Sequence, residues 1–241
     1  MTDLTGKKVL ITGGSQGIGL ALAQALTEAG AKVYINGSNA EKATAAAAGI
    51  AGAEAAVYDL AKADCADALY AITGAVDILI LNASVQFRTP WHSIPDDEFD
   101  RQIHINLRAN LKLIQKYAPY MQQKHWGRII TVGSVQQTKP HKDMLIYAAT
   151  KSALENMVRN LAKQLAPDGI TVNNIVPGVI ETPRNEKALS DESYAKQVLS
   201  GIPCGYAAPA QACAPAVLML CSEESHYITG ANIDIDGGMK L

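Results

Sequence analysis

Ser134, Tyr147 and Lys151 have the residue types and the spacing for acid–base chemistry in this chain of 241 residues. Tyr147 and Lys151 are four positions apart at the start of a predicted helix, so their side chains lie on one face. A nearby ammonium group favours the phenolate and lowers the pKa of a tyrosine from its ordinary value of about 10. Such a tyrosine exchanges a proton with a carbonyl or alcohol oxygen, and a serine hydroxyl stabilises charge on that oxygen. Taken alone, the pair equally fits an amphipathic surface helix.

A glycine-rich turn follows the first apolar run of the chain and directly precedes a helical pattern. Glycines at such a turn allow a sharp bend, close approach of the backbone to a pyrophosphate, and tight packing of the helix on the sheet. The start of the helix adds a partial positive charge. The alternative is a turn that binds nothing, but the strand–turn–helix setting favours a dinucleotide. The residues predicted to bind it are Gly13, Ser15, Gln16, Gly17, Ile18 and Gly19.

Short apolar runs alternate with longer helical patterns along the whole chain. Strands are predicted over residues 8–12, 32–36, 54–58, 77–81, 128–132, 171–176 and 232–235. Helices are predicted over residues 17–29, 40–48, 64–72, 98–120, 147–165 and 211–221. Continuous apolar strands separated by helices indicate a parallel sheet covered on both faces. We therefore expect an α/β fold with a doubly wound, Rossmann-type parallel sheet of about seven strands, in one domain that spans residues 1–241.

Two stretches of the sequence indicate where in this fold the reaction takes place. Ser134 and Tyr147 follow the fifth predicted strand, at the edge of the sheet where doubly wound folds bind ligands. Residues 178–209 are irregular and polar, with a short helix expected at 190–199. We interpret this segment as a lid that closes over bound substrate.

The composition argues against several classes of protein. Hydrophobic residues make up 48% of the chain, which is enough for a large core. Lys and Arg (21) nearly balance Asp and Glu (23), so the net charge of -2 gives no reason to expect nucleic acid or an acidic membrane as partner. No apolar run approaches the ~20 residues of a membrane span, and the N-terminus has no signal-peptide pattern. The four cysteines are far apart, which argues against a disulfide framework or a metal site and favours the cytoplasm.

The order of these motifs resembles that of the short-chain dehydrogenase/reductase family. The resemblance runs over residues 12–238 and includes the glycine turn, an Asn-Ala pair, a helix asparagine, the serine, Tyr-x-x-x-Lys and a Pro-Gly pair. It implies that Ser134, Tyr147 and Lys151 are catalytic and that Asn106 holds a proton-relay water beside the lysine. It also implies hydride transfer between a nicotinamide cofactor and a carbonyl or alcohol. By residue type alone, Asn106 equally fits a helix-bending or packing role.

The resemblance assigns further residues to the cofactor. Asp59 and Leu60 match positions that close the adenine pocket, and Asn82 and Ala83 match positions that line the adenosine ribose. The family positions around the nicotinamide correspond here to Tyr147, Lys151, Pro177, Gly178, Ile180 and Thr182.

The segment after the fourth strand departs from the family pattern. The usual Asn-Asn-Ala-Gly is replaced by residues 81–84, which read Leu-Asn-Ala-Ser. Leu81 predicts an apolar contact where an amide is common. Ser84 predicts a backbone angle that suits a residue other than glycine.

The choice between NADP and NAD depends on the end of the second strand. The acid that commonly selects NAD is missing there, and Ser38 stands where NADP-preferring members often carry arginine. Ser38 and Asn39, with Lys42 nearby, are predicted to hold a 2′-phosphate, so we expect NADP in preference to NAD. The alternative is that Ser38 and Asn39 only cap the next helix.

The substrate is expected to meet the loops after strands four, five and six. Gln136 and Gln137 are predicted to touch it together with Ser134 and Tyr147. The other loop candidates are Gln86, Phe87, Arg88, Trp91, His92, Lys139, His141, Lys142, Glu181 and Arg184. This polar, mildly basic set suits a sugar, polyol, keto acid or 3-oxoacyl thioester. For any one of these charges, simple solvation is the alternative.

Three functions follow from these observations. The first is an NAD(P)-dependent oxidoreductase of small polar carbonyl compounds. The second is a 3-oxoacyl thioester reductase of the fatty-acid type, and the third is a dinucleotide-binding regulator without turnover. The resemblance also implies a homotetramer in which helices 98–120 and 147–165 pack against neighbouring copies; ordinary core packing is the alternative for their apolar residues.

Overall fold

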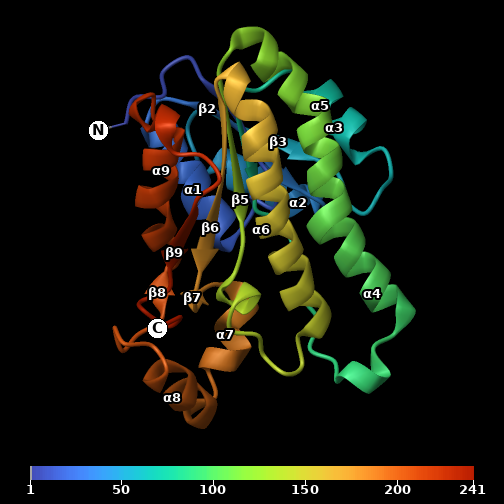
Figure 1. Ribbon diagram of the computed structural model, residues 1–241, viewed down its shortest axis with the longest axis vertical. Helices are drawn as coiled ribbons and strands as arrows, with labels where there is room; N and C mark the ends of the chain where they lie inside the picture. The colour runs from blue at the N-terminus through green and yellow to red at the C-terminus, as the bar shows by residue number, and fades with distance from the viewer. Residues whose placement is uncertain (1) are drawn as a thin grey trace.

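A parallel sheet forms the centre of the molecule, and helices cover both of its faces (Figure 1). The computed structural model describes residues 2–241. The strands of the sheet are β1 (Lys8–Ile11), β2 (Lys32–Gly37), β3 (Ala53–Val57), β4 (Ile78–Leu81), β5 (Gly127–Val132), β6 (Ile170–Pro177) and β9 (Asn232–Ile235). Their order is β3-β2-β1-β4-β5-β6-β9, and every neighbouring pair is parallel. Every residue of β4, β5 and β6 is buried, which fits the mostly apolar character of these central strands.

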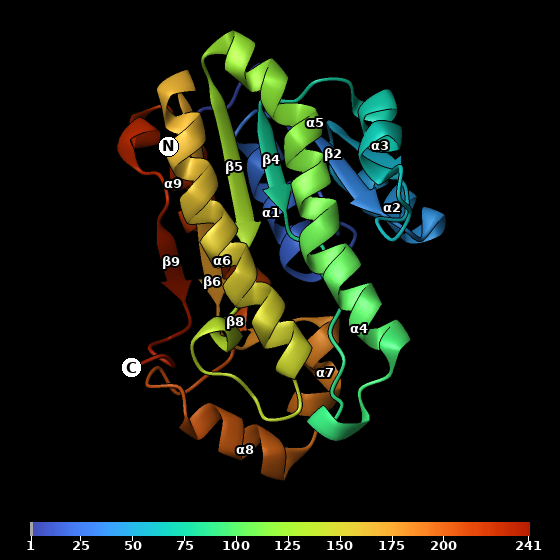
Figure 2. The same ribbon diagram turned by 45° about the vertical axis from the view of Figure 1, so that its right-hand side comes forward.

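Two layers of helices bury the two faces of the sheet. One face is covered by α1 (Gly17–Glu28), α2 (Ala40–Ala48) and α9 (Ala214–Cys221). The other face is covered by α3 (Cys65–Thr73), α5 (Ala109–Lys124) and α6 (Leu145–Leu165), and Figure 2 shows α5 and α6 in front of β4 and β5. Leu26 and Val217 belong to the first core, while Leu69, Leu113 and Val158 belong to the second.

The predicted fold class is confirmed, because the sheet is doubly wound and has seven strands in the predicted chain order. Most predicted boundaries are within two residues of the observed ones, which is expected where helix ends and strand ends fray. The short regular segments include 3₁₀ turns at Trp91–Ser93, Val135–Gln137, Ala166–Asp168, Ala210–Cys213 and Glu224–Tyr227. Within residues 2–241, no helix combines the length and the apolar character needed to cross a membrane.

The prediction of one continuous helix over residues 98–120 was wrong. The chain forms α4 (Asp96–Ile103), a π-helical turn (His104–Arg108) and then α5. The Nδ2 of Asn110, in the first turn of α5, donates a hydrogen bond of 2.7 Å to the main-chain oxygen of Asn106 in the π-helical turn. A wider turn of this kind bends the helix and redirects the side chains around it.

The segment over residues 178–209 lies at the carboxyl edge of the sheet. It contains β7 (Ile180–Glu181), α7 (Pro183–Leu189), α8 (Glu192–Ser200) and β8 (Ala208–Pro209), and β7 pairs with β8 in a small separate sheet. Figure 1 shows α7 and α8 beyond the ends of β5 and β6. The helix expected at 190–199 corresponds to α8, whereas α7 was not predicted. Thr182 before Pro183 is a typical helix start, and this signal was available in the sequence.

Candidate active site

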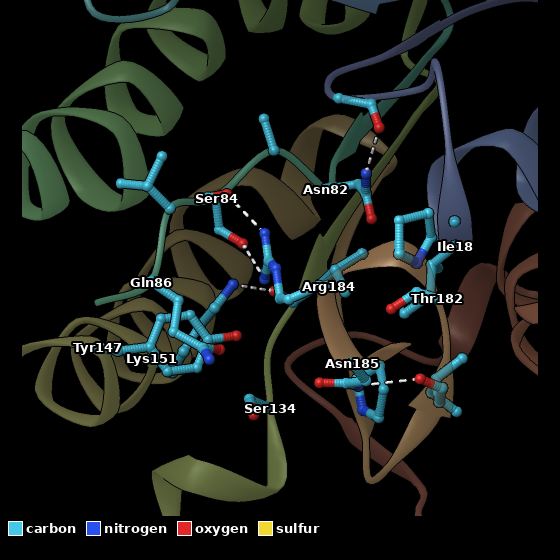
Figure 3. A pocket seen from close by; sticks show the side chains of 18 of the residues that line it. Ile18, Asn82, Ser84, Gln86, Ser134, Tyr147, Lys151, Thr182, Arg184 and Asn185 are labelled. Atoms are coloured by element: carbon cyan, nitrogen blue, oxygen red, sulfur yellow. Dashed lines mark hydrogen bonds between the residues drawn. The ribbon is translucent and has the colours of Figure 1, made fainter. Parts of the chain in front are cut away.

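A cavity of about 480 Å³ opens at the carboxyl edge of the sheet, beside the neighbouring strands β1 and β4. The chain runs from β1 outward through β2 to β3 and then crosses back to β4. The loops after β1 and β4 therefore diverge and leave a crevice, which is where doubly wound folds bind ligands. Loops after the strands, the start of α6 and residues of α7 line the cavity (Figure 3).

Tyr147 and Lys151 lie in the first two turns of α6 and line the cavity (Figure 3). Their exposed fractions are only 5% and 2%. The Lys151 Nζ donates a hydrogen bond of 2.6 Å to the main-chain oxygen of Val132 at the end of β5. The same ammonium lies 5.5 Å from the centroid of the Tyr147 ring. The structure thus brings this pair together inside the cavity rather than on a solvated surface.

Opposing effects set the pKa of Tyr147. Burial raises the pKa of the phenol, because the phenolate loses its hydration. The positive charges of Lys151 and Arg184, with hydrogen bonds from Ser134 and Ser84, outweigh burial, so the pKa of Tyr147 lies below its ordinary value of 10.0. Burial also lowers the pKa of Lys151 below 10.5; the Tyr147 phenolate opposes this shift and Arg184 adds to it. The arrangement therefore eases proton release from the phenol.

Ser134 lines the cavity at the end of β5, where it starts the 3₁₀ turn Val135–Gln137. Its Oγ accepts a hydrogen bond of 3.2 Å from the Gln136 main-chain nitrogen. Gln136 lines the cavity as predicted, but Gln137 does not. The Gln137 Nε2 instead donates to Glu155 of α6 at 2.7 Å, and its Oε1 accepts from the Ser134 main-chain nitrogen at 3.4 Å. Gln137 completes a capping box, which Ser followed three residues later by Gln also predicts.

The glycine-rich turn forms the wall of the cavity beside β1. Gly13, Ser15, Gln16, Gly17 and Ile18 line it, whereas Gly19 does not. A Cβ added to Gly19 lies 2.4 Å from the Gly13 oxygen and 2.6 Å from the Asn82 Nδ2, so Gly19 allows α1 to pack tightly. The start of α1 has no side-chain cap and no acid in its first turn. Uncapped amide groups at a helix start fit a diphosphate.

Asn82 joins the glycine turn to β4. Its Nδ2 donates to the main-chain oxygens of Thr12 and Gly13 at 3.0 and 2.9 Å. In return, the Thr12 Oγ1 accepts from the main-chain nitrogens of Asn82 and Ala83, both at 3.0 Å. Asn82 and Ala83 line the cavity as predicted, and Leu81 is buried in the core, as its apolar character suggested. Among the described residues other than glycine only His125 has a positive φ, so Ser84 has an ordinary backbone, as expected.

The far end of the cavity is the part next to the ends of β2 and β3. It is lined by Ser38, Asp59 and Leu60, three of the predicted cofactor residues. Asn39 lies outside the lining. Its side chain accepts a hydrogen bond of 2.8 Å from the Lys42 main-chain nitrogen and caps α2, which is the alternative use of this residue type. The predicted residues at and after the end of β6 also line the cavity: Pro177, Gly178, Ile180 and Thr182.

Asn106 is buried outside the cavity lining, in the π-helical turn. Its Oδ1 accepts from the Val85 main-chain nitrogen at 2.9 Å, and its Nδ2 donates to the Val85 oxygen at 3.0 Å. The Nδ2 also donates to the Thr150 Oγ1 of α6 at 3.1 Å. The Asn106 side chain therefore joins the loop after β4 and α6 to the π-helical turn, and the water role that the resemblance implies for this residue stays a prediction.

The loop candidates for substrate contact divide into two groups. Gln86, Arg88, His141 and Arg184 line the cavity, whereas Phe87, Trp91, His92, Lys139, Lys142 and Glu181 do not. Sequence reasoning missed several lining residues, among them Tyr58, Arg101, Met144, Asn185 and Met239. Tyr58 directly precedes Asp59, so the argument that assigned Asp59 to the cofactor site could also have identified Tyr58. Met239 reaches the cavity only through the folded path of the C-terminal segment, for which the sequence carries no local signal.

Known proteins match the chain over nearly its whole length. A family model described as enoyl-(acyl carrier protein) reductase matches residues 13–240. The 3-oxoacyl-(acyl-carrier-protein) reductase FabG of Rickettsia prowazekii is 36% identical over 242 residues, which is 100% of each chain. Glucose 1-dehydrogenase of Gluconobacter oxydans is 36% identical over 98% of this chain and 92% of that protein. The gluconate 5-dehydrogenase of Burkholderia cenocepacia, solved with NADP and tartrate, has a TM-score of 0.91 at 32% identity, covering 98% and 96% of the two chains.

With this fold and this site, the chain is a nicotinamide-dependent oxidoreductase that interconverts carbonyl and alcohol groups. It belongs to the short-chain dehydrogenase/reductase family. Its relatives at this level of identity include enzymes named for 3-oxoacyl thioesters and enzymes named for sugars.

Gly19→Ala tests the packing of the glycine turn. The added Cβ meets the Gly13 oxygen at 2.4 Å, so we expect the free energy of unfolding to fall by about 2 kcal/mol. Urea denaturation measures this change. The control is Gly49→Ala, because Gly49 has a helical φ of -79 and its added Cβ lies 3.6 Å from the nearest atoms. We expect the control to keep or slightly raise stability. Equal stability of the two variants would contradict the tight approach at Gly19.

Proposed function

We propose that this enzyme interconverts a carbonyl and a secondary alcohol on a small polar substrate, such as a sugar, polyol or keto acid, with NADP as its preferred cofactor. The observation that carries the proposal is the buried Tyr147–Lys151 pair facing a cavity with polar lining. Ser84, Gln86 and Gln136 are among the lining residues and offer hydrogen-bonding groups. A hydroxylated substrate needs such groups to fix its orientation.

Tyr147 is the proposed general acid and base. Its hydroxyl gives a proton to the substrate oxygen in reduction, and its phenolate takes one in oxidation. The Ser134 hydroxyl donates a hydrogen bond to the same oxygen and stabilises its negative charge. The Lys151 ammonium, anchored on the Val132 oxygen, stabilises the phenolate. When bound, the nicotinamide supplies or accepts the hydride.

Asn106 is proposed as a positioning residue. Its amide fixes Val85 in the loop after β4 and Thr150 in α6, three residues after Tyr147. Through these bonds the π-helical turn fixes the loop after β4 relative to α6, the helix that carries Tyr147 and Lys151. Removing the amide leaves the partly buried main-chain N–H and C=O groups of Val85 without these partners, which is costly.

The cofactor is proposed to lie along the cavity from the far end to Tyr147. The uncapped start of α1 and the glycine turn hold the diphosphate. Asp59 and Leu60 enclose the adenine, and Asn82 and Ala83 lie beside its ribose. The carboxamide of the nicotinamide meets the backbone of Ile180 and the hydroxyl of Thr182, near Pro177 and Gly178.

The preference for NADP rests on Ser38. It lines the far end of the cavity directly after β2, and no acid stands at the end of that strand. The acid that accepts hydrogen bonds from a ribose 2′-hydroxyl is therefore missing. The gluconate 5-dehydrogenase that shares this fold was solved with NADP, which supports the same choice.

A 3-oxoacyl thioester is the second candidate substrate. The similarity to 3-oxoacyl-(acyl-carrier-protein) reductases over the whole chain favours it. The segment over residues 178–209, proposed here as the lid, has to admit a long acyl chain in that case. A panel of keto sugars, keto acids and 3-oxoacyl thioesters distinguishes the two substrate classes.

The assembly is proposed to be a homotetramer that acts in the cytoplasm. Phe99 of α4, Leu111 of α5 and Leu145 of α6 are exposed apolar side chains on the helices that the family resemblance assigns to subunit contacts. Exposed apolar side chains on neighbouring helices favour association with a second copy.

Tyr147→Phe tests the proposed mechanism. Loss of the proton-transferring hydroxyl is expected to lower kcat about a thousandfold, while the Kd for NADPH stays within about twofold. Absorbance of the reduced nicotinamide, followed with each substrate of the panel, measures the rate. Tyr227→Phe is the control, because Tyr227 is 93% exposed. A Tyr147→Phe variant with near-normal turnover would rule out the assigned acid.

Ser38→Asp tests the cofactor choice. A carboxylate at this position repels the 2′-phosphate, so we expect the Kd for NADPH to rise about a hundredfold while that for NADH changes little. Titration of each cofactor by its fluorescence measures both constants. Ser38→Asn serves as the uncharged control. An unchanged preference in Ser38→Asp means that the 2′-phosphate binds elsewhere.

A further inference from the structure

Arg184 in the first turn of α7 reaches across the cavity to the loop after β4 (Figure 3). Its Nη1 donates to the Ser84 Oγ at 3.0 Å, and its Nη2 donates to the Ser84 main-chain oxygen at 2.7 Å. The two residues are 100 positions apart in the sequence. Together they form a bridge between the lid and the body of the enzyme, which we call the Arg184–Ser84 bridge.

The Arg184–Ser84 bridge lies between the part of the cavity next to the glycine turn and the part next to Tyr147 and Lys151. Figure 3 shows Ile18 and Thr182 on one side of the Arg184 guanidinium, and Tyr147 and Lys151 on the other. The charge of Arg184 acts on both Tyr147 and Lys151, which places it near the catalytic pair. A dinucleotide that extends from the glycine turn to Tyr147 has to pass this point.

The guanidinium of Arg184 has neutral partners only. Among the described residues no carboxylate forms an ion pair with it, and both of its acceptors belong to Ser84. Of the described residues that line the cavity, Arg88, Arg101, Lys151 and Arg184 carry positive charge, whereas Asp59 at the far end is the one carboxylate. The lining of the cavity therefore has an excess of positive charge.

An oxyanion is a better partner for Arg184 than Ser84 is. A guanidinium makes two parallel, charge-assisted hydrogen bonds to a phosphate, and these are about twice as strong as bonds to neutral oxygens. Arg184 is also exposed to solvent, so its bonds to Ser84 contribute little net free energy and exchange easily. Both conditions favour a change of partner when an anion enters the cavity.

We propose that Arg184 binds the diphosphate of the nicotinamide cofactor. The Arg184–Ser84 bridge opens when the dinucleotide enters, and the guanidinium turns toward the diphosphate at the start of α1. This role rests on the proposed path of the cofactor along the cavity. It couples the lid to cofactor binding, because α7 carries the cation. It also gives the two members of the bridge opposite effects: Arg184 favours the bound state, whereas Ser84 favours the free state.

The experiment measures the Kd for NADPH by fluorescence in the wild type, Arg184→Met and Ser84→Ala. Arg184→Met is expected to weaken binding about tenfold, which corresponds to about 1.4 kcal/mol. Ser84→Ala removes one of the two acceptors of the bridge without a backbone change, and is expected to tighten binding about threefold. Lys196→Met, which removes a positive charge from α8 outside the cavity lining, is the matched control and is expected to bind as the wild type does.

Adenosine 2′-monophosphate is the second probe, because it carries the 2′-phosphate and lacks the diphosphate. Its Kd is expected to be the same in all four proteins. Thermal unfolding of each variant verifies that it is folded, so a change in affinity reports on the cavity. Arg184→Gln repeats the test with a polar side chain in case Arg184→Met does not fold.

Three results overturn the proposal. If Arg184→Met binds NADPH as the wild type does and only its KM for a carboxylated substrate rises, Arg184 recognises the substrate and not the diphosphate. If Ser84→Ala and Arg184→Met both weaken NADPH binding, the bridge is a structural clamp. If Arg184→Met weakens adenosine 2′-monophosphate equally, the effect is not on the diphosphate. A failure of the proposed chemistry appears separately, as a wild type that binds NADPH and reduces no carbonyl compound.

Discussion

The buried ammonium group of Lys151 is the constraint on which the active site depends. A charge with an exposed fraction of 2% is costly unless it is paired, and here the Val132 oxygen and the Tyr147 phenol compensate for the lost water. The oxygen of Val132 is in reach because the last residue of β5 lies against the second turn of α6. The end of β5 therefore supplies the acceptor for the lysine of α6. The proximity of this ammonium to Tyr147 contributes to the lowering of the tyrosine's pKa.

Hydrogen bonds between distant segments hold this arrangement. Thr12 and Asn82 join β1 to the end of β4, and Asn106 joins the following loop to α6. Behind Ser134, Glu155 accepts from Gln137 and from Asn232 of β9. Groups fixed in this way keep their geometry while the proton moves. By contrast, α7 is joined to the loop after β4 through solvent-exposed hydrogen bonds of Arg184, which contribute less net free energy than the buried ones.

The parts of this structure that depend on local patterns could be predicted from the sequence. Apolar periodicity determines the strands and most helices, and the Tyr–Lys spacing determines that both residues share one face. Other features depend on partners that are distant in the sequence. Gln137 turns away from the cavity toward Glu155, and the π-helical turn breaks a pattern that reads as one helix. Arg184 was identified only as one of several loop charges, because its partner Ser84 lies 100 positions away.

The most direct test of the central role of Lys151 is the pH dependence of carbonyl reduction at saturating NADPH, in the wild type and in Lys151→Met. Reduction needs the protonated phenol, so the rate falls as the pH rises through the pKa of Tyr147, which lies below 10.0 in the wild type. Without the ammonium the phenolate is less stable and this pKa rises. We expect a lower rate in Lys151→Met and a decline that begins at higher pH. A decline at the same pH in both proteins would contradict the claim that Lys151 tunes Tyr147.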